Sequence, residues 1–442
     1  MTPSLLLLLA LQASIPSTTT RATAADLPID PTLAPRPNIL VLIADDFGVD
    51  LVGAYGEGAS PACTANIDQL AAEGLLFRNA WANPSCSPTR ASLLTGRHGF
   101  RTGIGSPVSN QDAGLSLGEL TLPEALTGYA SAAIGKWHLA GNQGDFHPNT
   151  SGFSSFAGII RGGLGNYSNW QKTVNGQTSQ TTTYATIDSA DGAIDAILNL
   201  PEPWFTYVSF NAPHTPTHVP PITSCPLLPC PGSLCGNLPA NPTTAESVKA
   251  MSEAMDQEIG RVLAVLDAVD PNAYVIFLGD NGTTRQATEP PFDRDHAKGT
   301  VYEGGVNVPL IIRGPGVRQG ETDGLVSMVD IYATVTELAR TRVTPEDSVS
   351  MVPYFRNPDL SLRETVYSEI FSPNGGSLPF ASHRRAVRDA RYKLIRETGQ
   401  ADELYDLSVD PFETMNLAQN PTPPQQAAYD LLLDRLVELG VQ

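Results

Sequence analysis

Four short apolar runs are the strongest structural signal in the chain. They cover residues 38–43, 131–134, 204–210 and 273–278. Each is nearly continuous in apolar residues and rich in β-forming side chains, and the second run is the weakest of the four. Such runs are typical of central parallel strands, which are buried on both faces. We therefore predict four buried strands.

Helical patterns separate these runs. Apolar residues recur at helical spacing over Ile67–Phe77, with Asn66 as a candidate N-cap, and again over Val248–Val269. Strands that alternate with helices predict an α/β fold, in which helices sandwich a large, mostly parallel sheet.

The pattern changes after Arg340. It predicts a strand, a hairpin and a final amphipathic helix, at residues 366–370, 384–388 with 392–396, and 425–439. We expect a main domain over residues 36–345 and a small C-terminal α+β subdomain over residues 350–442, which covers an edge of the main sheet.

The net charge of the 442-residue chain is −19. This acidic charge argues against binding to nucleic acid, because phosphate binding needs a basic surface. It argues equally against docking on an anionic membrane. An anionic substrate would have to be held by a local cluster of cations.

The first 25 residues predict a signal peptide. Leu5 to Leu11 form a short apolar core, and Ala22-Thr23-Ala24 resembles a small-residue cleavage site. Export to the periplasm, the medium or the secretory lumen is expected. No later run is long and apolar enough for a membrane span.

There are five cysteines, at positions 63, 86, 225, 230 and 235. If Cys86 is reserved for chemistry, the other four allow three disulfide connectivities, and the sequence does not choose among them. An exported protein would be expected to close the Pro-rich stretch 220–242 with a disulfide. A zinc site is the competing hypothesis, but the spacing without a neighbouring histidine fits zinc poorly.

Each predicted strand ends in polar residues that could carry chemistry. In chain order these are Asp45 and Asp46, Lys136 and His138, His214, and Asp280 and Asn281. The carboxyl ends of parallel strands meet at one edge of a sheet, so these side chains should converge. The oxygen ligands suit Ca²⁺, or less well Mg²⁺, and a cation would relieve repulsion between adjacent carboxylates. The histidines are candidate acid and base groups.

Two further segments supply candidate residues. Lys298 lies in a glycine-containing segment, residues 296–305, and with Lys136 could neutralise an anion. Cys86 opens the segment 86–97, in which Pro88 suits a helix start and Arg90 falls on the first turn. Position 86 would then lie at a helix N-terminus, a natural anion site.

The segment from Cys86 to Arg97 resembles the signature of the type I sulfatases, in the alkaline-phosphatase-like superfamily. Other family-like stretches are residues 37–46, 135–139, 211–216, 279–282, 298–309, 391–395 and 403–407. The resemblance covers nearly the whole mature chain. Gly279 departs from it, because serine or threonine is expected there. The glycine-rich run 158–165 around Arg161 has no assigned role, and the insert 220–242 is expected at the pocket rim.

The resemblance implies that a formylglycine-generating enzyme oxidises Cys86 to an aldehyde, whose hydrate is the nucleophile and whose second hydroxyl allows sulfate to be released. It implies calcium bound by residue 86 together with Asp45, Asp46, Asp280 and Asn281. It further implies that Arg90 and Lys136 hold residue 86 and that His138 accepts a proton. His214 and Lys298 would contact the sulfate and the leaving oxygen.

The expected function is hydrolysis of a sulfated small molecule or carbohydrate, as in arylsulfatases or glycan sulfatases. One alternative is a formylglycine-dependent phosphate or phosphonate ester hydrolase. The other is a non-catalytic ligand-binding relative, which the retained nucleophile, metal set and histidines disfavour. The sequence gives no substrate identity and no oligomeric state.

Overall fold

The computed structural model describes residues 35–225, 230–341, 343 and 345–441. The predicted signal peptide lies outside the described residues. From Arg36 onward the chain forms one compact unit. The expected division into domains at 36–345 and 350–442 stays a prediction.

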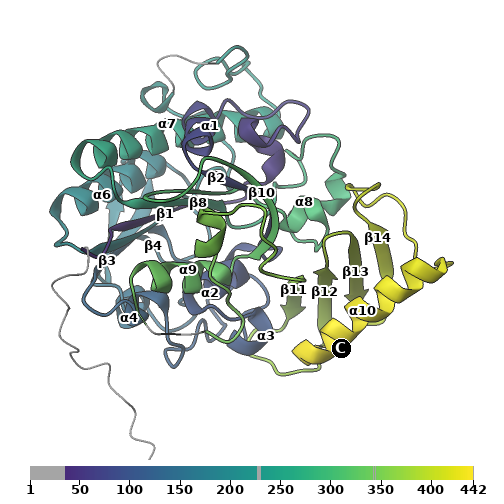
Figure 1. Cartoon of the computed structure of the whole chain (residues 1–442). Helices are drawn as coiled ribbons and strands as arrows, with labels where there is room; N and C mark the ends of the chain where they lie inside the picture. Colours follow the sequence, from purple (N-terminus) through teal and green to yellow (C-terminus); the bar gives the residue numbers. More distant parts are fainter. Residues whose placement is uncertain (1–34, 226–229, 342, 344, 442) are drawn as a thin grey trace, which may run out of the picture. The chain divides into compact units, whose positions relative to one another are not determined.

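A ten-stranded sheet runs through the main part of the molecule (Figure 1), in the order β10-β2-β9-β8-β1-β7-β3-β4-β5-β6. The four predicted strands are β1 (Ile39–Ala44), β3 (Ala130–Lys136), β7 (Trp204–Ser209) and β8 (Tyr274–Gly279). They lie side by side at its centre, and every pairing among them is parallel. The predicted α/β fold is confirmed.

The flanking strands extend this centre on both sides. They are β2 (Leu75–Trp81), β4 (Ser155–Ile159), β5 (Trp170–Val174), β6 (Gln177–Thr181), β9 (Leu310–Arg313) and β10 (Gly320–Ser327). β4 pairs parallel with β3, and β10 pairs parallel with β2. β9 runs antiparallel to both neighbours, and β5 and β6 form an antiparallel hairpin. The sheet is therefore mixed, but mostly parallel.

Helices cover both faces of the sheet. α1 (Ala65–Glu73), α6 (Ala185–Asn199) and α7 (Thr244–Val269) cover one face, and α2 (Cys86–Thr95), α4 (Leu122–Ala125) and α9 (Asp330–Leu338) cover the other (Figure 1). Side chains alternate along β1, so Leu40 and Leu42 enter one hydrophobic cluster while Val41 and Ile43 enter the other. Each such side chain contributes about 1.5–3 kcal/mol when fully buried.

The helix predicted over Ile67–Phe77 was placed too far along the chain. α1 spans Ala65–Glu73 and follows Thr64 rather than Asn66. Leu75 to Phe77 begin β2 instead. Gly74 separates the two elements, and the apolar residues after it pair with β9 and β10, so tertiary pairing overrides the helical spacing.

The C-terminal part is a four-stranded antiparallel sheet, β11 (Val366–Ser372), β12 (Ser382–Arg388), β13 (Tyr392–Glu397) and β14 (Glu403–Asp406), covered by α10 (Pro423–Leu439). Leu432 and Leu436 of α10 pack in one cluster with Val387 and Leu394 of the sheet. The predicted strand, hairpin and helix are confirmed. The shorter helices are α3 (Gly99–Thr102), α5 (His147–Thr150) and α8 (Glu303–Val306).

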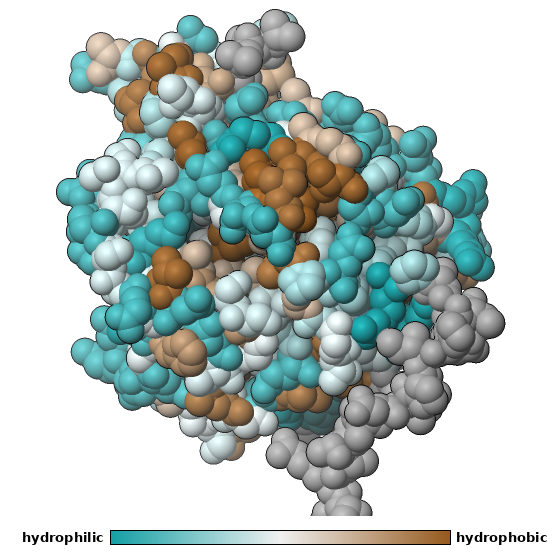
Figure 2. Space-filling model, turned by 90° about the vertical axis from the view of Figure 1, so that its left-hand side faces the viewer, coloured by the Kyte–Doolittle hydropathy of each residue, from teal (hydrophilic) through white to brown (hydrophobic). Residues whose placement is uncertain are grey.

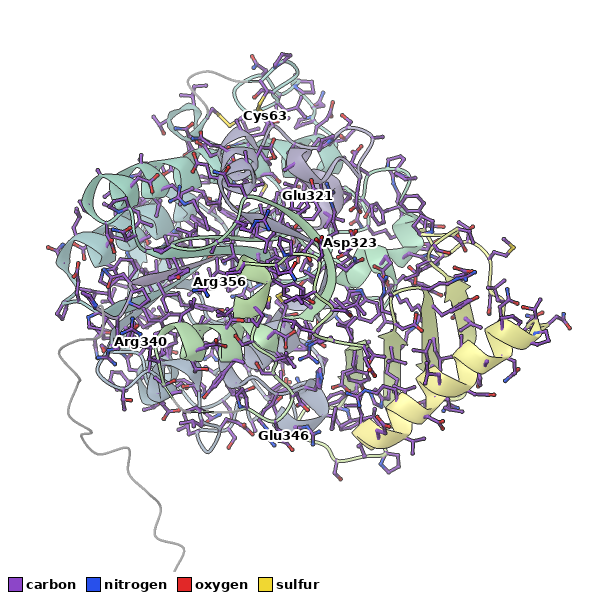
Figure 3. The ribbon with its side chains drawn as sticks, in the orientation of Figure 1. Cys63, Glu321, Asp323, Arg340, Glu346 and Arg356 are labelled. Atoms are coloured by element: carbon purple, nitrogen blue, oxygen red, sulfur yellow. A yellow bond between two sulfur atoms is a disulfide. The ribbon has the colours of Figure 1, made fainter. Side chains whose placement is uncertain are left out.

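The four cysteines outside position 86 form two disulfides, Cys63–Cys230 and Cys225–Cys235, and Figure 3 labels Cys63. The structure thus selects one of the three connectivities, and none of these four cysteines keeps a thiol for the zinc alternative. Cys86 is buried and free. Glu253 of α7 accepts hydrogen bonds from the backbone N–H groups of both Leu234 and Cys235, which further fixes this loop.

Figure 2 shows a face on which hydrophilic residues predominate, interrupted by a few apolar clusters. Within the described residues, no helix is both long enough and apolar enough to cross a membrane.

Candidate active site

The side chains at the ends of the central strands converge, as predicted from the sequence. Asp45 and Asp46 follow β1, Asp280 follows β8 and Lys136 ends β3. The potential ligand atoms of Asp45, Asp46, Cys86 and His214 all lie within 4.8 Å of one another. The sheet topology therefore brings together residues that lie up to 169 positions apart in the chain.

Cys86 is the first residue of α2. Ser85 precedes it in an extended conformation, so Cys86 lies at the positive end of the helix dipole. The Cys86 Sγ lies 3.4 Å from Asp45 Oδ1, 3.3 Å from Lys136 Nζ and 3.8 Å from Lys298 Nζ. Burial, followed by the charge of Asp45, raises the pKa of the thiol to about 12. An unmodified Cys86 is therefore a neutral thiol and a poor nucleophile.

The three carboxylates are each paired with a cation. Lys136 Nζ lies 2.5 Å from Asp45 Oδ2, and Arg90 Nη2 lies 2.7 Å from Asp280 Oδ2. Lys298 forms the third ion pair, with Asp46. Burial raises the pKa of Asp45, but Lys136 and the neighbouring cations outweigh burial and hold that pKa well below its usual range. Repulsion between the carboxylates is thus largely balanced by the chain's own cations.

The donor set still fits a hard divalent cation. Asn281 Nδ2 donates to Asp46 Oδ1 over 2.9 Å, whereas Asn281 Oδ1 is fully buried and has no hydrogen-bond partner. An unpaired buried oxygen is costly unless something binds it. Burial and the charge of Asp45 raise the pKa of Asp280, which a cation would reverse. Three carboxylates and one amide oxygen are ligands that Ca²⁺ and Mg²⁺ prefer.

Arg90 forms hydrogen bonds with residues at the ends of three strands. Besides Asp280, its guanidinium donates to the Lys136 carbonyl oxygen over 2.8 Å and to Ser209 Oγ over 2.5 Å. It is fully buried. These hydrogen bonds go to the ends of β3, β7 and β8. The role that the family resemblance implies for Arg90, holding residue 86, stays a prediction. Ser209 was not among the predicted site residues, because nothing distinguishes a serine at a strand end.

The two histidines differ in their surroundings. His138 is buried, has a backbone φ of 60°, and leaves Nδ1 without a hydrogen-bond partner. Such a left-handed backbone is uncommon outside glycine and is concentrated at functional sites. Burial, reinforced by Lys136 and Arg90, lowers the pKa of His138 well below its usual value. His138 is therefore a neutral imidazole beside the cations.

His214 is more exposed and lies at the rim of the cluster. Its Nε2 is 4.0 Å from Asp46 Oδ2, and its Nδ1 is 2.7 Å from the Thr215 carbonyl oxygen. Because a carbonyl oxygen only accepts, Nδ1 carries a proton and Nε2 faces the cluster. Tyr167 fixes this loop by donating to the His214 carbonyl oxygen over 2.7 Å.

Two glycines of the run 158–165 contact the histidines. A Cβ added to Gly162 would lie 2.2 Å from His138 Nε2, whereas one added to Gly163 would lie 3.5 Å from His214 Cε1. The sequence showed this run but gave it no role. Gly279 is also explained, because a Cβ there would lie 2.1 Å from the Phe47 carbonyl oxygen.

Comparison with known proteins agrees with this geometry. The Sulfatase family model matches residues 37–341, and the model of the N-sulphoglucosamine sulphohydrolase C-terminal region matches residues 293–442. Arylsulfatase G of Rattus norvegicus is 31% identical over 84% of this chain and 77% of its own length. N-acetylgalactosamine-6-sulfatase of Homo sapiens is 32% identical over 76% of this chain and 69% of its own length.

Solved structures share the fold. Ps i-CgsB, in complex with k-i-k-neocarrahexaose, aligns with a TM-score of 0.77 and 24% identity over 92% of each chain. A second protein, in complex with its substrate D-glucosamine-2-N,6-O-disulfate, aligns with a TM-score of 0.72 and 21% identity over 91% of this chain and 97% of that one. With the matched family model and relatives, these findings show that the chain belongs to the sulfatase family and is a sulfate ester hydrolase.

Proposed function

We propose that the protein hydrolyses sulfate esters of carbohydrates or small molecules through a formylglycine made from Cys86, with a Ca²⁺ ion at the ends of β1 and β8. The observation that carries the proposal is the position of Cys86. It opens α2 beside Asp45, Lys136 and Lys298 in a setting that keeps a thiol neutral and unreactive. Conversion to a hydrated aldehyde would supply a hydroxyl nucleophile and a second hydroxyl for release of sulfate.

The metal-binding residues in this proposal are Asp45, Asp46, Asp280 and Asn281, together with residue 86. A bound Ca²⁺ would polarise a sulfuryl oxygen and favour ionisation of the nucleophile. The residues alone bring three carboxylates and three cations, so a divalent ion gives the site a local positive charge. That charge suits a sulfate monoester, despite the acidic protein around it.

The other side chains have separate roles. Lys136 and Lys298, with the N-terminus of α2, neutralise the sulfuryl oxygens as negative charge develops. His138 is neutral at ordinary pH and accepts a proton from the group at residue 86. His214 directs Nε2 toward the cluster, where it can bond the sulfate or the leaving oxygen. Arg90 holds Asp280 and the strand ends in place.

Substrate class and location follow from other features. A relative at 32% identity is named for a sulfated amino sugar, which supports a carbohydrate sulfate. The apolar leader at residues 1–25 and the two disulfides support export. Maturation would then require a formylglycine-generating enzyme in the host.

The test compares turnover of matched 4-nitrophenyl sulfate, phosphate and phosphonate esters by the wild type and by Cys86→Ala. The proposal predicts that the wild type prefers the sulfate, and that the variant is folded but inactive. A preference for the phosphate or phosphonate ester would favour the alternative function, a formylglycine-dependent phosphate or phosphonate ester hydrolase. An active Cys86→Ala variant would refute the nucleophile.

A further inference from the structure

A cavity of about 470 Å³ borders the hairpin β5–β6, and its lining includes none of the residues that surround Cys86. One wall is formed by residues 159–165 and another by the hairpin. Cavities of this size are typical of small-molecule sites. The sulfate ester reaction described above does not by itself require it.

The hairpin directs a polar face into this cavity. Asn175 and Gly176 form its turn, with φ values of 46° and 79°, as in the tight hairpins that Asn-Gly favours. The register pairs Gln171 with Gln180 and Thr173 with Thr178. Because side chains alternate along a strand, these two pairs share one face, and all four residues line the cavity.

The cavity offers neutral hydrogen-bonding groups. Gln180 accepts from Gln171 and donates to Asn169, and Thr178 donates to Asp145 over 2.9 Å. The charge of Asp145 is offset by Arg161, whose Nη2 lies 3.9 Å away. Leu164 and Trp170 add apolar surface. Amide and hydroxyl groups beside an apolar wall, with no net charge, suit a neutral polyhydroxylated ring better than a second sulfate.

The same segment connects the cavity to the histidines. The His138 N–H donates to the Ile160 carbonyl oxygen over 3.1 Å, and the backbone of Gly162 lies against the His138 ring. Gly163, which lines the cavity, lies beside His214. A glycan whose sulfate lies at residue 86 can therefore extend along residues 159–165 into the cavity.

We propose that this cavity is a subsite for a neutral, unsulfated sugar residue of a sulfated oligosaccharide, recognised by the polar face of the β5–β6 hairpin. The inference rests on the proposed action on sulfated carbohydrates. It adds where the adjoining sugar is bound and which residues select it.

Gln180→Ala tests the subsite, and Gln177→Ala is its matched control. Both glutamines are exposed on β6, but their positions differ by an odd number, so Gln177 faces away from the cavity. The kinetics of both variants are measured on carrageenan tetrasaccharides in which a neutral, unsulfated sugar adjoins the sulfated one, and on 4-nitrophenyl sulfate. Gln180→Ala should raise the KM for a cleaved tetrasaccharide about threefold to tenfold, the effect of one or two lost hydrogen bonds. The KM for 4-nitrophenyl sulfate should not change, and Gln177→Ala should match the wild type on both.

Other outcomes overturn the inference. An unchanged KM for the tetrasaccharide would show that Gln180 does not contribute to substrate binding. An equal loss on both substrates would mean that the hairpin acts through the fold or the catalytic residues. Cleavage of 4-nitrophenyl sulfate without cleavage of any tetrasaccharide would also contradict it, while leaving the sulfate ester chemistry intact.

A binding measurement separates this inference from the proposed function. The desulfated tetrasaccharides are titrated into the wild type and both variants by calorimetry. Weaker binding by Gln180→Ala alone supports the subsite even if the catalytic proposal fails. Absence of binding to all three proteins, or equal binding by all three, counts against the subsite.

Discussion

At the residue scale, the site is a set of charges that neutralise one another. Asp45, Asp46 and Asp280 were identifiable from the sequence because each directly follows a continuous apolar run. Their partners were not, since pairing with Lys136, Lys298 and Arg90 depends on strand order and register. The sequence-based expectation was that a bound cation relieves the repulsion between the carboxylates, and it did not include these ion pairs with the chain's own side chains.

Gly162 should be intolerant of a side chain. A Cβ at this position would lie 2.2 Å from His138 Nε2, so Gly162→Ala must displace the imidazole or the loop. A displaced acid–base group should lower kcat on 4-nitrophenyl sulfate by about tenfold or more. Gly163→Ala, with an ordinary contact at 3.5 Å, should lose little. Equal kinetics of the two variants would argue against close packing on His138.

His138 should stay neutral across the physiological range. Burial and the nearby cations lower its pKa well below 6.5, so the proton is lost before the pH rises to neutrality. In a histidine NMR titration between about pH 5 and 8, its resonances should not shift with a midpoint near the usual value. The signal can be assigned through its loss in His138→Asn. A midpoint at or above 6.5 would contradict the lowered pKa of His138.

At the element scale, the ends of the central strands position the candidate site residues, and short loops surround them. The four strands and the Cys86 helix follow from apolar periodicity and from Pro88, which suits a helix start. The sequence analysis assigned no role to the glycine run 158–165 and did not predict the hairpin β5–β6. Hydrophobic periodicity carries no signal in these short polar segments, although Asn175-Gly176 is a turn signal that could have revealed the hairpin.

Metal removal should lower both the activity and the stability of the protein, because the proposed ligands lie at the ends of β1 and β8. Asp46 and Asn281 lie on these two ends, and a ligand that binds only the folded state adds to its stability. Dialysis against a chelator should lower both turnover and the melting temperature. A ligand at a hundred times its Kd adds about 3 kcal/mol to the free energy of unfolding, and metal removal should lose that amount. Added Ca²⁺ should restore both. An unchanged melting temperature after confirmed metal removal would count against these ligands.

At the scale of the whole molecule, buried charges join the main sheet to the C-terminal sheet. Lys393 of β13 is fully buried, and its Nζ lies 3.0 Å from Glu303 Oε1 of α8 and 2.7 Å from Glu413 Oε1. The sequence predicted both sheets, but Lys393 resembled an ordinary charge on a hairpin. Contacts between distant segments leave no periodic pattern, so this junction was visible only in the structure.

Lys393→Met should destabilise the fold strongly. Removal of the ammonium group takes away the cation that pairs with both buried carboxylates, although Arg388 still pairs with Glu303. Loss of one partner of a buried ion pair typically costs about 3–5 kcal/mol. Arg391→Met is the matched control, since its pair with Asp406 is 57% exposed on the arginine side and should matter little. Denaturant unfolding measures both. Equal stability of the two variants would mean that the buried cluster does not hold the sheets together.

The central claim is that catalysis depends on the aldehyde at position 86. It is tested by producing the protein with graded amounts of a formylglycine-generating enzyme, then measuring kcat on 4-nitrophenyl sulfate and the formylglycine fraction by peptide mass spectrometry. The account predicts that kcat rises in proportion to that fraction and falls to zero without it. Full turnover by protein that retains only unmodified Cys86 would contradict it.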